Sequence, residues 1–143
     1  MGLCFLCGNF VSFVFRDFFF RIGTMPKFQK HVFICQNQRP AEHHRGSCDP
    51  GGTGELQKIF KKKLADHGIR GDQVRANKSG CLEQCEHGPT VVVYPEAVWY
   101  GGVQAADVDE IIESHILGGK PVERLLIADE CLNAEKCAHR PRK

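Results

Sequence analysis

The sequence predicts a small α/β domain with a mixed sheet, and three observations support this fold class. A short apolar run is followed by an amphipathic helical stretch and then by a second strand-like run, which is typical of a β-α-β unit. A hairpin pattern and a second amphipathic helix follow further along the chain. With 143 residues, 42% of them hydrophobic, the chain is long enough to build one core.

The first half of the domain has the pattern strand, helix, strand. Residues 30–35 (KHVFIC) form an apolar run rich in strand formers, which predicts a buried strand. Thr53 is expected to cap a helix that ends at Gly68, with the apolar side chains of its interior on one face. A second strand is expected over about residues 73–78. Because a helix crosses between them, the two strands should be parallel.

The second half predicts a hairpin and a helix. Residues 90–94 favour a strand, and residues 98–100 return as its hairpin partner. Asp107 and Glu110 form a capping-box-like pair at the start of a helix that Gly118-Gly119 ends. This order of elements predicts a thioredoxin-like α/β sandwich with a small mixed sheet.

The two ends of the chain differ from this domain. Residues 1–24 are rich in phenylalanine without a helical or strand period, and we expect a non-native or upstream extension, with translation starting at Met25. The alternative is a membrane-associated leader, although the apolar run is too interrupted for a membrane span. The α/β domain is expected over residues 25–127, ending in a short apolar element at 122–127. Residues 128–143 have the composition of a polar C-terminal tail.

Composition limits the classes of function. The formal net charge is +2, so there is no general case for binding nucleic acid, which usually needs a strong basic excess. No nucleophile–base pair or pair of carboxylates stands out, and we expect no enzymatic activity. Eight cysteines suggest a disulfide scaffold, but their uneven spacing and the lack of a convincing secretory signal favour reduced thiols in the cytoplasm and a metal site.

The most informative pattern is Cys35-x12-Cys48-x32-Cys81-x3-Cys85. The first two cysteines border the loop between the first strand and the first helix, and the other two follow the second strand. Parallel strands of a β-α-β unit end on the same side of the sheet, so the four thiols should converge. Two separated pairs suit a cluster of two metal ions, and four thiolates select iron–sulfur or zinc. A structural zinc site usually has two tight knuckles, whereas only the second pair is tight here.

From residue 30 to about residue 127 the chain resembles the thioredoxin-like 2Fe-2S ferredoxins. The matching segments are HVFIC at 31–35, GSC at 46–48, NKSGC at 77–81, CEHGP at 85–89, VVYPE at 92–96 and VWY at 98–100. The x12 and x3 spacings also match the family pattern. The resemblance implies one 2Fe-2S cluster in a homodimer that passes single electrons between redox proteins. It also implies that Cys35 and Cys48 bind one iron, and that Cys81 and Cys85 bind the other.

Two alternatives remain open. One is a non-redox binding module in which the same cysteines hold zinc. The other is an obligate subunit of a larger oxidoreductase, because the chain is also similar to the cluster-bearing small subunit of respiratory complex I and related hydrogenases, although their first gap is much shorter. For an electron carrier we expect a low potential, since reduction adds charge to an anionic cluster. Candidate amide donors to sulfur are Gly46, Ser47, Gly80 and the amides around Glu83.

The remaining features have plainer interpretations. His87 is expected to be a surface histidine, and Cys131 and Cys137 to be free thiols in the tail. Cys4-x2-Cys7 precedes every expected strand, which argues against a thioredoxin-type dithiol site. Four lysines of the first helix are expected to form a solvated face; the alternative is that they dock an acidic redox partner. They are Lys58, Lys61, Lys62 and Lys63.

Overall fold

We describe the protein from a computed structural model, in which residues 27–134 and Cys137 are described. The predicted extension over residues 1–24, with Cys4 and Cys7, lies outside the described residues, as does most of the tail after residue 134. The start at Met25 and the boundaries of the extension therefore stay predictions.

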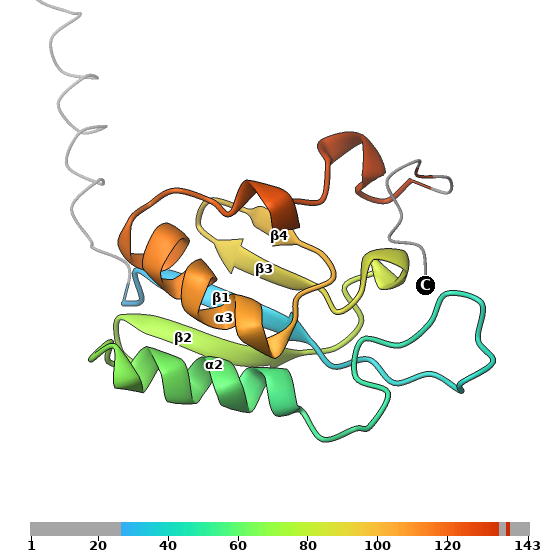
Figure 1. Cartoon of the computed structure of the whole chain (residues 1–143), viewed down its shortest axis with the longest axis horizontal. Coiled ribbons are helices and arrows are strands. Elements are labelled where there is room, and N and C mark those ends of the chain that lie inside the picture. Colours follow the sequence, from blue (N-terminus) through green and yellow to red (C-terminus); the bar gives the residue numbers. More distant parts are fainter. Residues whose placement is uncertain (1–26, 135–136, 138–143) are drawn as a thin grey trace, which may run out of the picture.

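A mixed sheet of four strands forms the centre of the molecule (Figure 1). The strands are β1 (Lys30–Cys35), β2 (Val74–Ser79), β3 (Val91–Tyr94) and β4 (Val98–Tyr100), in the spatial order β2-β1-β3-β4. β1 pairs in parallel with β2 and antiparallel with β3, and β3 and β4 form the hairpin. β1 and β4 match their predicted ranges, and β2 and β3 each begin one residue later than predicted.

The helix α2 (Glu55–Asp66) crosses from β1 to β2, as predicted, but it begins differently. Its N-cap is Gly54 in the left-handed region at φ 62°, and no side chain caps the helix, so the prediction that Thr53 is the cap was wrong. The Gly54 amide donates instead to the Asp49 carboxylate at 2.9 Å. Gly68, at φ 71°, follows the last turn and confirms the predicted end.

The second helical segment is also capped differently from the prediction. It runs through a 3-10 turn (Ala105–Asp107), α3 (Val108–Glu110) and a π-helical stretch (Ile111–Leu117). The capping box pairs Gln104 with Asp107, whose carboxylate accepts the Gln104 amide at 2.7 Å. Asp107 therefore occupies the third position of the box and not the predicted first position, and both its carboxylate and that of Glu110 pair with Arg124.

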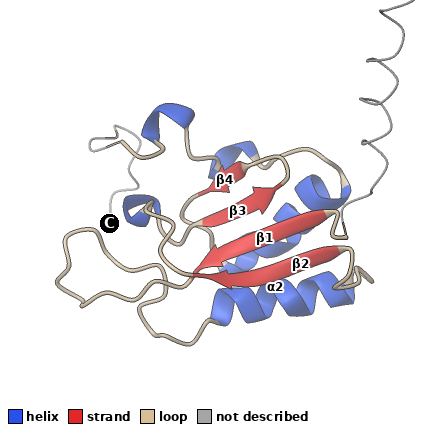
Figure 2. Ribbon diagram, turned by 180° about the vertical axis from the view of Figure 1, so that it is seen from behind, coloured by secondary structure: helices blue, strands red, loops and turns tan. Residues whose placement is uncertain are grey.

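Both helices lie on one face of the sheet, and they leave the other face open (Figure 2). β1 shows the division: Val32 and Ile34 are buried under the helices, whereas His31 and Phe33 alternate with them and are partly exposed. The buried apolar side chains between the two layers include Val32, Ile34, Phe60, Leu64, Val91, Val93, Val108, Ile111 and Ile112. This arrangement is the predicted α/β sandwich.

The segment after the second helix closes the free edge of β4. The predicted apolar element at 122–127 is a 3-10 turn (Glu123–Leu125) followed by an antiparallel bridge between Leu126 and Tyr100. The Ile127 amide donates to the Trp99 carbonyl at 2.9 Å, which holds the segment in place. In the part of the chain that the structure describes, no helix has the length and apolar character needed to span a bilayer.

The tail corrects one of the sequence predictions. Cys131 and Cys137, expected to be free thiols, form a disulfide, with their Cα atoms 5.1 Å apart. The reason is local: a 3-10 turn (Asp129–Cys131) reverses the chain, and the Ala134 amide donates to the Cys131 carbonyl at 3.4 Å. The two sulfurs are six residues apart in the chain, so a turn at this point brings them within bonding reach.

Candidate metal centre

The four cysteines of the spacing pattern lie together where β1 and β2 end. Cys35 is the last residue of β1 and pairs in register with Ser79, the last residue of β2. Cys81 therefore emerges beside Cys35, and Cys85 begins a 3-10 turn (Cys85–His87) four residues later. Cys48 reaches the same place from the loop between β1 and α2. All four thiols are free, and three are buried, with Cys81 partly exposed.

The sulfurs form two pairs. Cys81 Sγ lies 3.6 Å from Cys85 Sγ. In the other pair the Cys48 thiol donates a hydrogen bond to the Cys35 sulfur, which lowers the pKa of Cys35 to about 6 although burial opposes this shift. The same contact, together with burial, raises the pKa of Cys48. Each pair thus combines a first cysteine on or just after a strand with a second from a loop.

The pairing of the sulfurs bears on whether the site holds one metal ion or two. Four thiolates around a single zinc ion would all lie about 3.8 Å apart, because tetrahedral Zn–S bonds are about 2.3 Å long. The sulfur contacts instead join the cysteines two by two, Cys81 with Cys85 and Cys35 with Cys48. Two pairs of this kind suit a dinuclear cluster in which each metal ion takes one pair.

A guanidinium not predicted from the sequence lies against the second pair. Arg39 Nη2 is 3.3 Å from Cys85 Sγ and 3.6 Å from Cys81 Sγ, and these contacts raise the pKa of Arg39. The backbone amide of Arg39 donates to Ser47 Oγ at 3.3 Å, which holds the Arg39 loop against the segment leading to Cys48. The sequence could have pointed to Arg39 only as a basic residue between Cys35 and Cys48, because which groups it contacts depends on how this loop folds.

Backbone amides also point at the sulfurs. The Glu83 amide, predicted as a donor, contacts Cys81 Sγ at 3.4 Å, and Glu83 adopts a left-handed φ of 60°. The predicted Gly46 donor is wrong, because its amide donates to the His43 carbonyl at 2.9 Å. The amides of Asn37 and Leu82 donate to the Cys35 sulfur, and these contacts further lower the pKa of Cys35.

Cys48 receives similar support from the segment that follows Cys85. The Thr90 amide donates to the Cys48 sulfur, which partly opposes the rise in its pKa. Gly88 packs so closely that a Cβ placed there would lie 2.8 Å from Cys48 Sγ. The structure shows no comparable sulfur contact for the predicted amides of Ser47 and Gly80, both of which it describes.

Unpaired buried donors gather in the loop that leaves Cys35. Four buried side-chain nitrogens have no hydrogen-bond partner among the described residues: His115 Nε2 in the core, and Gln36 Nε2, Asn37 Nδ2 and Arg39 Nε. The last three belong to this loop. Buried donors normally have partners, so their concentration here fits a bound anionic group that supplies acceptors. The residues present therefore suit a sulfide-containing cluster.

A second arginine joins the two cysteine loops. Arg45 Nε contacts the Glu86 carboxylate at 2.8 Å, and its Nη2 donates to the Glu83 carbonyl at 2.8 Å. Nη2 also contacts the second Glu86 oxygen at 3.3 Å, which makes the pairing with this carboxylate bidentate. Arg45 therefore links the loop that carries Cys48 to the loop that carries Cys81 and Cys85.

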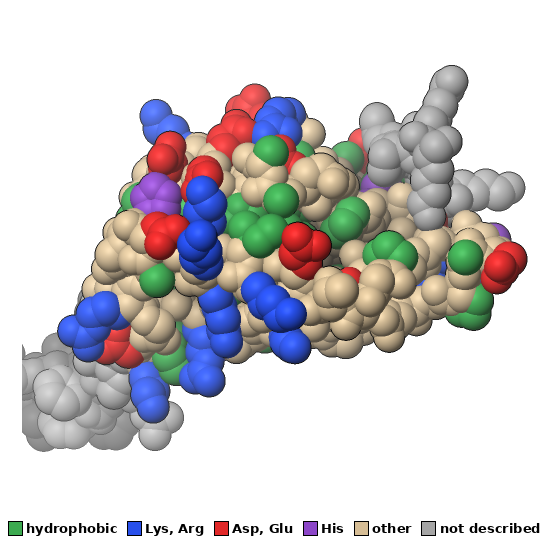
Figure 3. Space-filling view, turned by 60° about the horizontal axis from the view of Figure 1, so that its bottom comes forward, with side chains coloured by type: hydrophobic (Ala, Val, Ile, Leu, Met, Phe, Trp, Pro, Cys, Tyr) green, Lys and Arg blue, Asp and Glu red, His purple; other side chains and the backbone are tan. Residues whose placement is uncertain are grey.

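Two further sequence predictions have definite outcomes. His87, expected at the surface, is only 5% exposed, so that prediction was wrong. Its imidazole lies beside Cys131 and Cys137 of the tail, a contact that the sequence did not predict. The lysines of α2 agree better with the predicted solvated face, with Lys58, Lys61 and Lys62 exposed. Lys63 pairs with Asp109 at 2.7 Å, and basic side chains line this side of the molecule (Figure 3).

Comparison with known proteins identifies the family. No family model matches the chain. It is 46% identical over 99 residues to "Ferredoxin, 2Fe-2S" from Aquifex aeolicus (strain VF5), an alignment that covers 69% of this chain and 89% of the relative. It is 42% identical over 97 residues to "Ferredoxin, 2Fe-2S" from Clostridium pasteurianum, covering 68% of this chain and 94% of that protein.

A solved structure agrees with these relatives. The 1.5 Å crystal structure of the thioredoxin-like [2Fe-2S] ferredoxin from Aquifex aeolicus matches with a TM-score of 0.64 at 46% identity, covering 70% of this chain and 97% of that chain. The predicted thioredoxin-like fold class is confirmed. The chain belongs to the thioredoxin-like 2Fe-2S ferredoxins.

Proposed function

We propose that this protein binds one 2Fe-2S cluster through Cys35, Cys48, Cys81 and Cys85 and acts as a one-electron carrier between redox proteins. The main support is the meeting of two pairs of free thiols in a member of this family. When bound, such a cluster supplies a reversible one-electron couple. The comparisons do not favour the two alternatives, a zinc-holding module and a subunit of a larger oxidoreductase.

Binding a metal requires each ligand thiol to lose its proton. The hydrogen bond from Cys48 lowers the pKa of Cys35 and raises the pKa of Cys48, so the first proton of this pair leaves easily and the second leaves when the metal binds. Cys35 and Cys48 would hold one iron, and Cys81 and Cys85 the other. Four cysteine ligands leave no coordination position for a substrate, so we expect electron transfer without catalysis by the protein itself.

The donors around the sulfurs adjust the charge of the site. Hydrogen bonds from N–H groups to ligand sulfurs stabilise negative charge and so favour the reduced form. Arg39 adds a full positive charge beside the second pair, at 3.3 Å from Cys85 Sγ. We still expect a low potential overall, and a redox titration that gave a clearly positive midpoint would contradict this expectation.

Electron exchange should occur on the side of Cys81. It is the partly exposed member of the four, whereas Cys35, Cys48 and Cys85 are buried. Electron-transfer rates fall steeply with distance, so a redox partner should dock against the surface around Cys81. Glu83, whose amide contacts Cys81 Sγ, carries a negative charge at this surface and pairs with Arg45 at 3.1 Å.

The open face of the sheet supports the proposed homodimer. Four aromatic rings follow one another across it, with Phe28 and His31 4.8 Å apart, His31 and Phe33 5.7 Å apart, and Phe33 and Tyr94 6.1 Å apart. Tyr94 remains 42% exposed. An aromatic patch of this kind on an uncovered sheet is typical of a protein interface. A Phe33→Glu variant that stayed dimeric in light scattering would exclude this face.

We also propose a cytoplasmic location. Four free thiols gathered at one site suit a reducing compartment, in which the Cys131–Cys137 disulfide would be open. Thiol trapping in intact cells would test this proposal, since it reports the oxidation state of each cysteine before lysis.

Metal analysis tests the proposed function directly. Protein purified without oxygen should contain two irons and two sulfides per chain, absorb visible light, and give an electron paramagnetic resonance signal after treatment with dithionite. Colourless protein containing zinc in place of iron would overturn the proposal. Co-purification of all the iron-loaded protein with a large partner would instead support the subunit alternative.

A further inference from the structure

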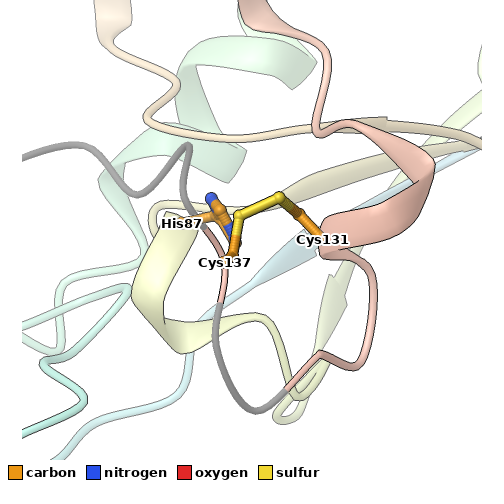
Figure 4. Close-up of side chains that lie close together, drawn as sticks. All are labelled: His87, Cys131 and Cys137. Carbon is orange, nitrogen blue, oxygen red and sulfur yellow. A yellow bond between two sulfur atoms is a disulfide. The ribbon is translucent and has the colours of Figure 1, made fainter.

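A second group of metal-ligating side chains lies outside the four-cysteine site. His87, Cys131 and Cys137 each place one ligand atom within 4.8 Å of the others. They come from three segments: the 3-10 turn that begins at Cys85, the start of the tail, and a position six residues further along it (Figure 4). In the structure the two sulfurs are joined in a disulfide beside the imidazole. We refer to these three residues as the tail site.

Contacts that do not involve the disulfide hold two of the three residues in place. Gln84 and Asn133 form a reciprocal pair, with Gln84 Nε2 donating to Asn133 Oδ1 at 2.8 Å and the Asn133 amide donating to Gln84 Oε1 at 3.2 Å. The backbone of His87 is fixed separately, because its carbonyl accepts the Gly102 amide at 2.7 Å. The part of the tail that carries Cys131 would therefore stay against the His87 turn after the disulfide is broken.

Burial also suits a metal site. Cys131 is 2% exposed and His87 is 5% exposed, so water would compete little for these ligands. Cys137 is partly exposed, which gives a reductant and then a metal ion a way in. Two thiolates and an imidazole are the ligand set that zinc prefers, and a water molecule can complete the tetrahedron.

We propose that the tail site is a redox-gated zinc site. A dithiol reductant transfers two electrons and two protons to the disulfide; its own thiols become a disulfide, the Cys131–Cys137 bond breaks, and two thiols form. Zn²⁺ then binds both sulfurs and a ring nitrogen of His87, and the two thiol protons are released. The sulfurs must separate to about 3.8 Å in a tetrahedral zinc site, which rotation of the two cysteine side chains can provide. Oxidation of the pair closes the site to metal.

Native mass spectrometry of the holoprotein tests this proposal. The iron-loaded chain is incubated without oxygen with one equivalent of Zn²⁺, with or without prior treatment with dithiothreitol followed by its removal. We expect one additional zinc per chain after reduction, none before it, and an unchanged iron content. Absence of zinc after reduction would overturn the proposal, and so would zinc uptake matched by loss of iron, which would place the zinc on the other four cysteines.

Variants identify the ligands. In His87→Gln and Cys131→Ser the amount of additional zinc bound per chain should fall at least tenfold. The control is His67→Gln, which removes an imidazole at the end of α2 and should bind as much zinc as the wild type. The visible spectrum of each variant shows whether it is folded and loaded. Zinc binding that persists in His87→Gln and Cys131→Ser would refute the assignment. If the wild type contained no cluster, the same comparison of variants would still report on the tail site, so the two proposals can fail separately.

Discussion

The two groups of cysteines that the structure describes differ in how they are held. Cys35 and Cys81 are placed by the ends of two paired parallel strands, and their sulfurs accept hydrogen bonds from backbone amides. Cys131 and Cys137 lie in a tail with no strand to place them, and they are bonded to one another. Sulfurs surrounded by donors are suited to a lasting thiolate state, whereas the tail pair can exchange electrons with a dithiol. Whether a pair of cysteines in this protein is free or bonded to one another therefore follows from the strands, amides and turns that surround it.

The strongest test of this comparison removes one sulfur from each group. Cys48→Ala should lower bound iron by about tenfold or more, because a lost ligand should cost at least as much as a lost supporting contact. Cys131→Ala should keep iron at the wild-type level. Iron and sulfide analysis with visible absorption measures both. If Cys131→Ala lost the pigment, or Cys48→Ala kept it, the assignment of the two groups would be reversed.

A second test examines packing against Cys48. In Gly88→Ala the new methyl would lie 2.8 Å from Cys48 Sγ and 3.3 Å from the Cys85 carbonyl oxygen. Gly88 has φ −66° and ψ 156°, which alanine also adopts before proline, so the cost comes from the contact and not from the backbone.

We expect Gly88→Ala to lower the free energy of unfolding of the holoprotein by about 1–3 kcal/mol. Gly71→Ala is the matched control, since a Cβ there meets nothing within 4 Å. Denaturant unfolding and the rate of cluster loss measure the effect. Equal stability of the two variants would show that the Cys48 pocket adapts freely.

A third test concerns the charged donor. Arg39→Gln removes the guanidinium beside Cys81 and Cys85 and should lower the reduction potential by about 60 mV, equivalent to about 1.4 kcal/mol for one electron. Arg39→Lys should recover part of the shift through its charge. The control is Arg70→Gln, whose side chain is 76% exposed and pairs with Asp72. If Arg39→Gln and the control had the same reduction potential, the guanidinium would have no influence on it, and the amide donors would remain as the groups that adjust it.

The last test asks whether a buried histidine of the core, and not the cysteine pairs, makes the stability depend on pH. Burial lowers the pKa of His115, whose Nδ1 lies 2.7 Å from the Tyr100 hydroxyl. Its contribution to stability is complete above the unfolded-state pKa of about 6.5 and is lost as pH falls, because the unfolded state then binds a proton that the folded state does not.

The slope from His115 can reach about 1.4 kcal/mol per pH unit below that value. In His115→Phe this slope should disappear, and unfolding curves at several pH values between 5 and 8 measure it. An unchanged slope in the variant would assign the acid sensitivity to other groups, the cysteine pairs among them.

Local sequence patterns were enough to predict the elements and the meeting of the four cysteines. An apolar run such as residues 30–35 buries the same alternate side chains wherever it lies in a sheet, and a helix between two strands makes them parallel. Parallel strands end together, so the loops that follow β1 and β2 had to be neighbours. The predicted convergence of Cys35 and Cys81 therefore needed no knowledge of loop conformation.

Two features of the cysteine sites that the sequence did not reveal depend on contacts between distant segments. Arg39 in the loop after β1 contacts Cys85 in the loop after β2, and His87 is buried between residues 101–102 and the cysteines of the tail. Spacing along the chain does not encode such contacts, since loops without a regular period can adopt many paths. Secondary structure thus specified where the sulfurs meet, and the folding of the loops and tail specified which charges and partners surround them.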